Sequence, residues 1–340
     1  MTIEFLCSFG DAKPQVAISR LRLSGATKKL ICHCALAFLS KTSSLLVSER
    51  NVKLAFSSNA YLQFSIEDTI RRIADVGYTG IELLADVPHA WPAGLLPERR
   101  EAIRTCLDQH GLTISNINAF MMNAVADPRQ PYWHPGWTDP DQHYRAIRRE
   151  HTKRSLQLAK DLAAPHITTE PGGLVAPEQT WQEAANIFFE ELMPCVEIAE
   201  ALGVRLLIEP EPELLIERFD QYLQFIDRID SKMVGLNFDI GHAYCVGEDP
   251  QDWVPQMVEH TAHYHLEDIA VTRVHAHLIP GHGAIDFPAT LRAIADTGYE
   301  GWLTVELYPY IDSPDDAARE ARQFLVNTLT SLGDSKQASG

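Results

Sequence analysis

Ile73-Ala-Asp-Val-Gly77-Tyr-Thr-Gly-Ile-Glu-Leu83 returns almost unchanged near the other end of the chain, as Ile294-Ala-Asp-Thr-Gly298-Tyr-Glu-Gly-Trp-Leu-Thr-Val-Glu-Leu307. In both copies a helical pattern ends at a Gly, which supplies the left-handed residue that terminates a helix. The apolar run that follows lacks polar alternation, so it predicts a strand covered on both faces, as in a parallel sheet. Looser copies surround Gly111 and Gly203. The repeated unit is therefore a helix followed by a buried parallel strand.

The same unit accounts for the whole chain from residue 52 onward. Strands are predicted at 52–57, 79–84, 112–118, 165–170, 204–209, 233–239, 261–266 and 301–307. Helices are predicted at 65–76, 97–109, 142–162, 179–202, 218–229, 250–258, 287–297 and 314–330. Eight β-α units over about 280 residues predict the α/β class and a single (β/α)₈ TIM barrel. An open doubly wound sheet is the alternative, but its Gly-rich phosphate loop after an early strand is missing.

The predicted domain limits follow from the charge distribution and from the range of residues that the β-α units cover. Residues 1–50 hold seven Lys/Arg against three Asp/Glu and contain no β-α unit. We expect them to be a poorly packed N-terminal extension, either disordered or the product of an upstream start codon. The barrel is predicted to cover residues 51–332, and residues 333–340 to form a disordered tail.

The composition excludes several classes of partner. With 29 Lys+Arg against 46 Asp+Glu, the net charge is −17, which argues against nucleic acid because phosphate neutralisation needs a basic face. No apolar run reaches the roughly 18–20 residues that span a bilayer. Six scattered Cys form no disulfide framework, so we expect a reducing, cytoplasmic location. The expected partner is a small-molecule substrate, and a homo-oligomer is compatible with the sequence.

Carboxylates and imidazoles follow the later strands. They are Glu170 after strand four, Glu209 and Glu211 after strand five, Asp239 and His242 after strand six, His265 in strand seven and Glu306 in strand eight. Chemistry in such barrels sits at the carboxyl ends of the strands, so these groups are expected to converge. Converging carboxylates resist ionisation unless a cation neutralises them. Two Glu, one Asp and one His suit Mn²⁺, Zn²⁺, Co²⁺ or Mg²⁺.

Four short motifs make the pattern specific: Glu209-Pro210, Asp239-Ile-Gly-His242, His265-Leu-Glu-Asp268 and the isolated Glu306. From about residue 52 to 330 the chain resembles the xylose-isomerase-like TIM-barrel superfamily, which includes sugar-phosphate isomerases/epimerases, ketose 3-epimerases, inosose dehydratases and barrel-type AP endonucleases. The segment Pro280-Gly-His-Gly-Ala-Ile-Asp-Phe287 is similar to the one that precedes helix seven in that family.

The resemblance implies roles for these residues. Glu209, Asp239, His265 and Glu306 would hold a divalent metal, and Glu209 and Glu306 would also exchange protons with the substrate, as the corresponding glutamates do in ketose 3-epimerases. His242 would hold a substrate oxygen or a second metal. Further candidates for substrate binding are three residues near the predicted strand ends: Glu211, Asn118 and Arg273.

One departure from the epimerase pattern is the pair His275-Ala-His277. Barrel-type AP endonucleases carry an Asp-x-His pair at this place, which binds a further zinc. By that resemblance Glu170, His242, His275 and His277 would complete a second metal site. The alternative is that His275 and His277 contact a substrate phosphate or hydroxyl, or only line the loop.

The leading interpretation is a metal-dependent isomerase or epimerase of a small sugar or sugar-like polyol ketone, acting in carbohydrate metabolism through an enediolate. Three alternatives stay open. One is an inosose-type dehydratase or lyase, which uses the same enediolate chemistry. Another is a phosphodiester hydrolase with two or three metals. The last is a non-catalytic sugar-binding barrel, which is disfavoured because none of the metal ligands is missing.

Overall fold

The computed structural model describes residues 53–131 and 133–338, with side chains described up to residue 333. Its strands are β1 (Lys53–Ser57), β2 (Gly80–Leu84), β3 (Thr113–Asn118), β4 (His166–Thr169), β5 (Arg205–Ile208), β6 (Val234–Asp239), β7 (Thr261–Leu266) and β8 (Trp302–Val305). Its α-helices are α2 (Ile66–Val76), α3 (Pro97–His110), α4 (Gln142–Leu162), α5 (Trp181–Leu202), α6 (Phe219–Ile226), α7 (Ile240–Cys245), α8 (Pro250–Trp253), α9 (Phe287–Asp296) and α10 (Pro314–Ala338). Two 3₁₀-helices, η1 (Ser58–Tyr61) and η2 (Tyr308–Tyr310), follow β1 and β8.

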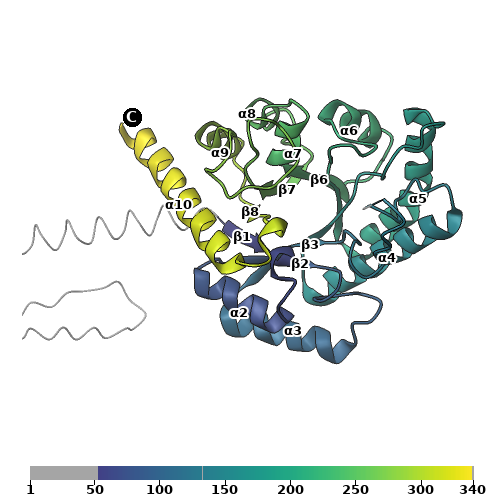
Figure 1. Cartoon of the computed structure of the whole chain (residues 1–340), viewed down its shortest axis with the longest axis horizontal. Coiled ribbons are helices and arrows are strands. Elements are labelled where there is room, and N and C mark those ends of the chain that lie inside the picture. The colour runs from purple at the N-terminus through teal and green to yellow at the C-terminus, as the bar shows by residue number, and fades with distance from the viewer. Residues whose placement is uncertain (1–52, 132, 339–340) are drawn as a thin grey trace, which may run out of the picture. The chain divides into compact units, whose positions relative to one another are not determined.

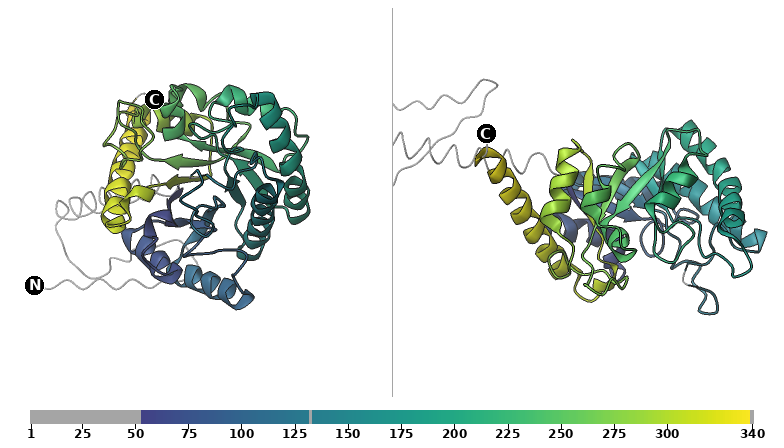
Figure 2. Two further views of the ribbon diagram at one scale, coloured as in Figure 1. Left: turned by 45° about the vertical axis from the view of Figure 1, so that its right-hand side comes forward. Right: turned by 90° about the horizontal axis from the view of Figure 1, so that it is seen from above.

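The strands close into a barrel in the order β1 to β8, every neighbouring pair being parallel (Figure 1). Closure occurs where Leu54 of β1 pairs with Leu303 of β8. Helices lie around the outside of the barrel, as the first view of Figure 2 shows. The predicted TIM barrel is therefore confirmed. None of the helices among the described residues is long and apolar enough to span a bilayer.

The repeated helix–Gly–strand unit forms as its residues dictate. The Ser65 hydroxyl accepts the Asp68 N–H at 3.2 Å and so caps the start of α2. Gly77 ends that helix with φ +101°, a conformation that a side chain disfavours. Gly80 then lets β2 approach β8, because a Cβ there would lie 2.5 Å from the Trp302 ring. The second and eighth units, which carry the repeat, therefore contact each other from either side of β1, the strand that pairs with both β2 and β8.

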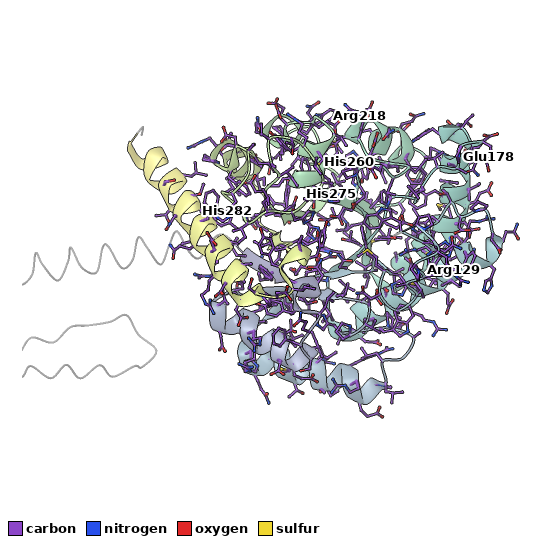
Figure 3. The ribbon with its side chains drawn as sticks, viewed as in Figure 1. Arg129, Glu178, Arg218, His260, His275 and His282 are labelled. Carbon is purple, nitrogen blue, oxygen red and sulfur yellow. The ribbon has the colours of Figure 1, made fainter. Side chains whose placement is uncertain are left out.

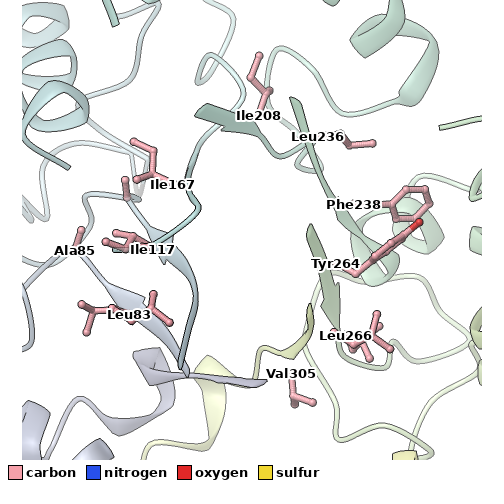
Figure 4. Packing of buried hydrophobic residues seen from close by; sticks show 14 of the residues in the cluster. Leu83, Ala85, Ile117, Ile167, Ile208, Leu236, Phe238, Tyr264, Leu266 and Val305 are labelled. Atoms are coloured by element: carbon pink, nitrogen blue, oxygen red, sulfur yellow. The ribbon is translucent and has the colours of Figure 1, made fainter. Parts of the chain in front are cut away.

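The strands alternate between an apolar outer face and a polar inner face. Figure 4 shows Phe238, Tyr264, Leu266 and Val305 pointing away from the barrel centre toward the helices. These side chains are buried in the main hydrophobic core between strands and helices. The polar residues Asn237, His263, His265 and Thr304 alternate with them along β6, β7 and β8 and therefore point inward.

Two local elements differ from the sequence prediction. α8 ends at Trp253 instead of 258, because Pro255 has no N–H to continue the helical hydrogen bonds. The unexpected helix α7 follows β6 directly, because the Asp239 carboxylate accepts the His242 N–H at 2.7 Å and caps it.

The two predicted terminal segments, 1–50 and 333–340, lie at or beyond the limits of the residues that the structure describes. The predicted extension at residues 1–50 lies outside the described residues. α10 continues to Ala338 instead of 330, into the range 333–340 that the sequence assigns to a tail, and that tail stays a prediction.

Candidate metal centre and active site

The four side chains expected to bind metal meet at the carboxyl ends of β5–β8. Nδ1 of His265 lies 2.7 Å from Oε1 of Glu209, 3.7 Å from Oδ2 of Asp239 and 3.8 Å from Oε2 of Glu306. Ligand atoms of Glu209, Asp239 and His265 all lie within 4.8 Å of one another. The four side chains are buried. The structure therefore brings the predicted quartet to one point.

A fifth residue, Glu82, which the sequence analysis missed, contacts the ring nitrogen of His265 that faces away from the other three side chains. Oε2 of Glu82, on β2, lies 2.7 Å from Nε2 of His265. The Asn116 side-chain amide donates to the same Glu82 oxygen at 2.7 Å. A carboxylate on the far nitrogen of a metal-binding imidazole fixes its orientation and raises its basicity. Burial lowers the pKa of His265, but Glu209, Glu82 and Glu306 together raise it well above its usual value.

The electrostatics of this cluster favour a cation. Burial raises the pKa of Glu306 well above its usual range, and the nearby carboxylates of Glu209, Glu82 and Asp239 raise it further, against the opposing effect of His265. Asp239 Oδ2 is buried, and no N–H group of the described residues donates to it. A buried acceptor without a donor is costly unless a ligand supplies the missing interaction. The orphaned oxygen and the mixed carboxylate–imidazole donor set therefore fit a divalent metal.

Two asparagines orient Glu306. The side-chain amide of Asn59, in η1, donates to Glu306 Oε1 at 2.8 Å, and the amide of Asn118, at the end of β3, donates to the same oxygen at 3.2 Å. The other oxygen, Oε2, faces His265. Asn118 was expected near the site from the sequence. Asn59 was missed, because the residues after β1 carry no recognisable motif.

Three of the four residues expected at a second metal site lie together. Ligand atoms of His242, His275 and His277 all lie within 4.8 Å of one another, and Nε2 of His275 is 3.1 Å from Nε2 of His277. Figure 3 shows His275 nearer the barrel than the peripheral Arg129 and Glu178. Burial lowers the pKa of His277 to about 4, so its imidazole is neutral at pH 7, the form that binds metals.

A further buried carboxylate, Glu267, adjoins this histidine cluster. Ligand atoms of Asp239, Glu267 and His277 lie within 4.8 Å of one another, and no N–H group among the described residues donates to either carboxylate oxygen of Glu267. Burial and the charge of Asp239 raise the pKa of Glu267 well above its usual value. Sequence reasoning missed this residue, although it lies inside the motif His265-Leu-Glu-Asp268.

Two candidates from the sequence lie elsewhere. Oε1 of Glu170 is 3.7 Å from Nε of the buried Arg148 and accepts the Trp137 backbone N–H at 3.2 Å, so this side chain faces Arg148 and Trp137 and not the histidine cluster. Arg273 donates to the Tyr244 carbonyl at 2.6 Å and pairs with Asp249 at 3.2 Å, and it is not among the residues that line the cavity.

A cavity of about 370 Å³ opens onto the quartet. Its lining includes Glu209 and Glu306 but neither Asp239 nor His265. The other lining residues are Asn59, Asn118, Phe120, Met122, Trp133, Glu211, Pro212, Glu213, His242, Val274, His275, His277 and Tyr308. Two members of the quartet thus face the space where a small molecule fits, and two lie behind them.

One wall of the cavity is held by a buried aspartate. Phe120, Met122 and Trp133 belong to the long segment between β3 and α4. Oδ2 of Asp86 accepts the backbone N–H groups of Met122 at 2.8 Å and Asn123 at 2.6 Å, and Oδ1 accepts that of Ala124 at 2.9 Å. This anchor fixes the beginning of the segment over the site.

The comparisons agree with this geometry. Residues 70–328 match the family described as Xylose isomerase-like TIM barrel, so the chain belongs to that family. Fructoselysine 3-epimerase of Escherichia coli O157:H7 is 25% identical over 282 residues, which cover 79% of this chain and 96% of that protein. Inosose dehydratase of Clostridium perfringens is 28% identical over 172 residues, which cover 45% of this chain and 57% of that protein.

Solved structures share the fold. A D-tagatose 3-epimerase-like protein superposes with a TM-score of 0.71 at 22% identity, over 84% of this chain and 99% of that one. The IOLI protein, whose crystal structure has a bound zinc atom, superposes with a TM-score of 0.68 at 19% identity, over 83% of this chain and 99% of that one. The chain is therefore a TIM barrel with sugar epimerases and dehydratases among its relatives and with a plausible metal site.

Proposed function

We propose that the chain is a divalent-metal-dependent epimerase or isomerase of a small polyhydroxylated ketone. One observation carries the proposal: Glu209 and Glu306, from separate strands, face the cavity, whereas Asp239 and His265 lie behind them. A reaction that removes a proton from a carbon next to a carbonyl and returns one needs two such groups. The other two members are placed to fix the ion.

The roles of the chain's residues follow from their contacts. A divalent cation held by Glu209, Asp239, His265 and Glu306 would polarise the carbonyl and stabilise the enediolate. One of the two glutamates removes the proton and the other returns it, and donation by Asn59 and Asn118 to Glu306 Oε1 leaves Oε2 as its acceptor. His242 and Glu211 line the same cavity and are placed to contact substrate hydroxyls.

The test is solvent-deuterium incorporation. Purified protein is loaded with Mn²⁺, Co²⁺, Zn²⁺ or Mg²⁺ and incubated in D₂O with a panel of ketoses and keto-polyols, and NMR follows the carbon next to the carbonyl. The expected result is deuterium at that carbon together with an epimer or isomer, both lost after chelation and restored by metal. Epimerisation that persists at full rate in chelated, metal-free protein would refute the proposal.

A second candidate, a phosphodiester hydrolase with more than one metal, is favoured by the cluster of His242, His275 and His277. Two metals provide a bridging hydroxide as nucleophile. Metal analysis separates the candidates: about one ion per chain with deuterium incorporation supports the epimerase. Two or more ions per chain, with phosphodiesterase activity abolished by His277→Ala and no deuterium incorporation, would replace it with the hydrolase.

A further inference from the structure

A second cavity, of about 500 Å³, adjoins the catalytic cavity of about 370 Å³. Its walls come mainly from the segment between β3 and α4 and from the loop between β4 and α5. Among the described residues, Trp133 alone lines both cavities. The side chain of Trp133 is half-buried. The two cavities therefore approach each other at this tryptophan.

The two cavities differ in chemical character. Carboxylates and imidazoles line much of the catalytic cavity. Most of the second lining is apolar, and its aliphatic members are Pro131, Pro140, Leu174, Val175, Ala176 and Pro177. No lysine or arginine belongs to this lining within the described part of the chain. Such a surface suits an apolar group and leaves a sugar hydroxyl or a phosphate without enough partners.

The walls of the second cavity are held by contacts that do not involve the Trp133 indole. The Thr138 N–H donates to the Gly172 carbonyl at 3.0 Å, which ties the two wall segments together. Nδ1 of His134 lies 2.7 Å from Oδ2 of Asp139. Shortening the Trp133 side chain is therefore expected to leave both cavities in place and to remove what stands between them.

The indole also limits the size of the catalytic cavity. It packs edge-to-face on Phe120, another residue of the catalytic lining, at a centroid distance of 6.0 Å. At about 370 Å³, the catalytic cavity is near the small end of the roughly 300–1,000 Å³ that ligand sites span. Joining it to the second cavity would more than double its volume and add an apolar space beside the polar one.

We infer that Trp133 determines the size of the substrate: its indole closes the catalytic cavity toward the second cavity, which receives an apolar substituent of the ketone when the indole is shortened. The inference rests on the proposed function and deepens it. In the wild type the ketone is confined to the catalytic cavity, so a bulky apolar substituent that points toward Trp133 is excluded. Trp133 takes no part in proton transfer and acts on specificity alone.

The experiment uses full-length, metal-loaded protein and the ketose of the deuterium panel that binds most tightly. This parent ketose is compared with its O-benzyl ethers, substituted at one end of the carbon chain or at the other in two separate series. Titration calorimetry measures binding, and deuterium incorporation measures reaction. In one series or both, wild type is expected to bind the benzyl ether at least about tenfold more weakly than the parent, because the ring forces the wall to move.

Variants of the shared residue test its role. In the series that wild type rejects, Trp133→Ala is expected to raise the ratio of benzyl-ether to parent affinities by at least about tenfold, because the ring passes from water into an apolar cavity. Trp133→Phe should give a smaller rise. Trp91→Ala is the matched control: Trp91 is also half-buried on a loop, lines neither cavity, and should leave the ratio unchanged.

A double variant locates the ring. Leu174 is 43% exposed and lines the second cavity but not the catalytic one. Leu174→Asp, added to Trp133→Ala, places a carboxylate in the apolar wall, so it should cancel the gain and leave the affinity for the parent as it is in Trp133→Ala. A gain that survives this change would show that the ring lies elsewhere and would overturn the inference.

Two further results contradict the inference. One is wild type binding the benzyl ether as tightly as the parent in both series. The other is a ratio that Trp133→Ala leaves unchanged, or that Trp91→Ala raises equally.

The two readouts separate the inference from the proposed function. If the ratio rises in Trp133→Ala and no ketose exchanges deuterium, the proposed epimerase is wrong and the size limit stands. If the parent ketose exchanges deuterium and the ratio does not move, the epimerase stands and the inference fails.

Discussion

The two halves of the barrel contribute different kinds of residue to the site. The strands β5–β8 supply the groups that converge at the proposed cation position, Glu209, Asp239, His265 and Glu306. The first half supplies the partners that hold them: Glu82 fixes His265, and Asn59 fixes Glu306. The difference teaches that the converging groups and their supports come from the two halves of the sequence, so neither half forms the site alone.

The largest effect is expected in the second half. Glu306→Gln keeps the size of the side chain, and Asn59 still has an oxygen to donate to, but the amide cannot take a proton. Turnover per bound metal should fall by roughly 10²–10⁴-fold. Initial epimerisation rates, normalised to metal content, provide the measurement. Glu259→Gln is the control for a lost surface charge, and a Glu306→Gln rate within tenfold of wild type contradicts the role.

Glu170 belongs to the first half of the barrel, because it follows β4, and its side chain lies beside Arg148 and away from the four converging groups. Burial raises its pKa to about 7 from the ordinary 4.5. The folded protein therefore keeps this proton at pH values where the unfolded chain has released it. The stabilisation of the fold by this retained proton is fully present below pH 4.5 and is lost as the pH rises to about 7.

Glu170→Gln should remove the part of the pH dependence of stability that comes from this carboxyl group. By linkage, the Glu170 proton changes the free energy of unfolding by up to about 3 kcal/mol between the unfolded pKa of 4.5 and the folded pKa of about 7. Urea unfolding of wild type and variant at pH 5 and pH 7.5 measures it: the wild type should lose stability relative to the variant at the higher pH. Identical pH dependence in the two proteins would show that Glu170 is ionised in the fold.

His265→Ala removes a ligand and is expected to lower metal affinity by at least tenfold to a hundredfold. The alanine leaves the carboxylates of Glu209, Asp239 and Glu306 without the imidazole that lies among them. Competition with a fluorescent chelator gives the affinity. His282→Ala, at an exposed imidazole paired with Glu320, is the matched control and should bind metal as wild type does. Full metal stoichiometry and affinity in His265→Ala would remove it from the ligand set.

The smallest effect on metal affinity is expected for Glu82, the first-half residue that holds His265. Glu82→Gln leaves a hydrogen-bonding side chain beside Nε2 of His265 but removes its charge, so metal affinity should fall by about tenfold, less than for loss of the ligand itself. Circular dichroism checks that the variant is folded. An affinity equal to that of wild type would show that the first half does not tune the site. A loss as large as in His265→Ala would place Glu82 among the ligands.

The sequence predicts the barrel, because apolar runs after helix-ending glycines mark the strands. Its resemblance to the xylose-isomerase-like family also picks out the four side chains that the structure brings together, whose role as metal ligands stays a prediction. The sequence does not predict Glu82 or Asn59, the residues that hold His265 and Glu306, and the reason is physical. Glu82 lies inside β2, and its partner is 183 residues away on β7, a pairing that only closure of the barrel creates. Arg273 misleads, because it lies near a strand end in sequence but pairs with Asp249.

The polar lining of the barrel was also beyond the sequence. Asn237 and His263 are buried, as the prediction of strands covered on both faces requires, but the sequence does not reveal that they hydrogen-bond to each other at 2.8 Å. An imidazole and an amide inside a barrel are tolerated only when each finds a partner. Those partners lie on different strands, so the pattern along one strand does not reveal them.

The central claim, that one of Glu209 and Glu306 removes the substrate proton and the other returns one, is tested most directly by half-reactions. Metal-loaded Glu209→Gln and Glu306→Gln are each incubated in D₂O with the two separated epimers of a substrate. Each variant retains one base, so we predict that each incorporates deuterium into one epimer only, without inversion, and that the two variants choose opposite epimers. Exchange of the same epimer by both variants, or of both epimers by either one, would contradict the account.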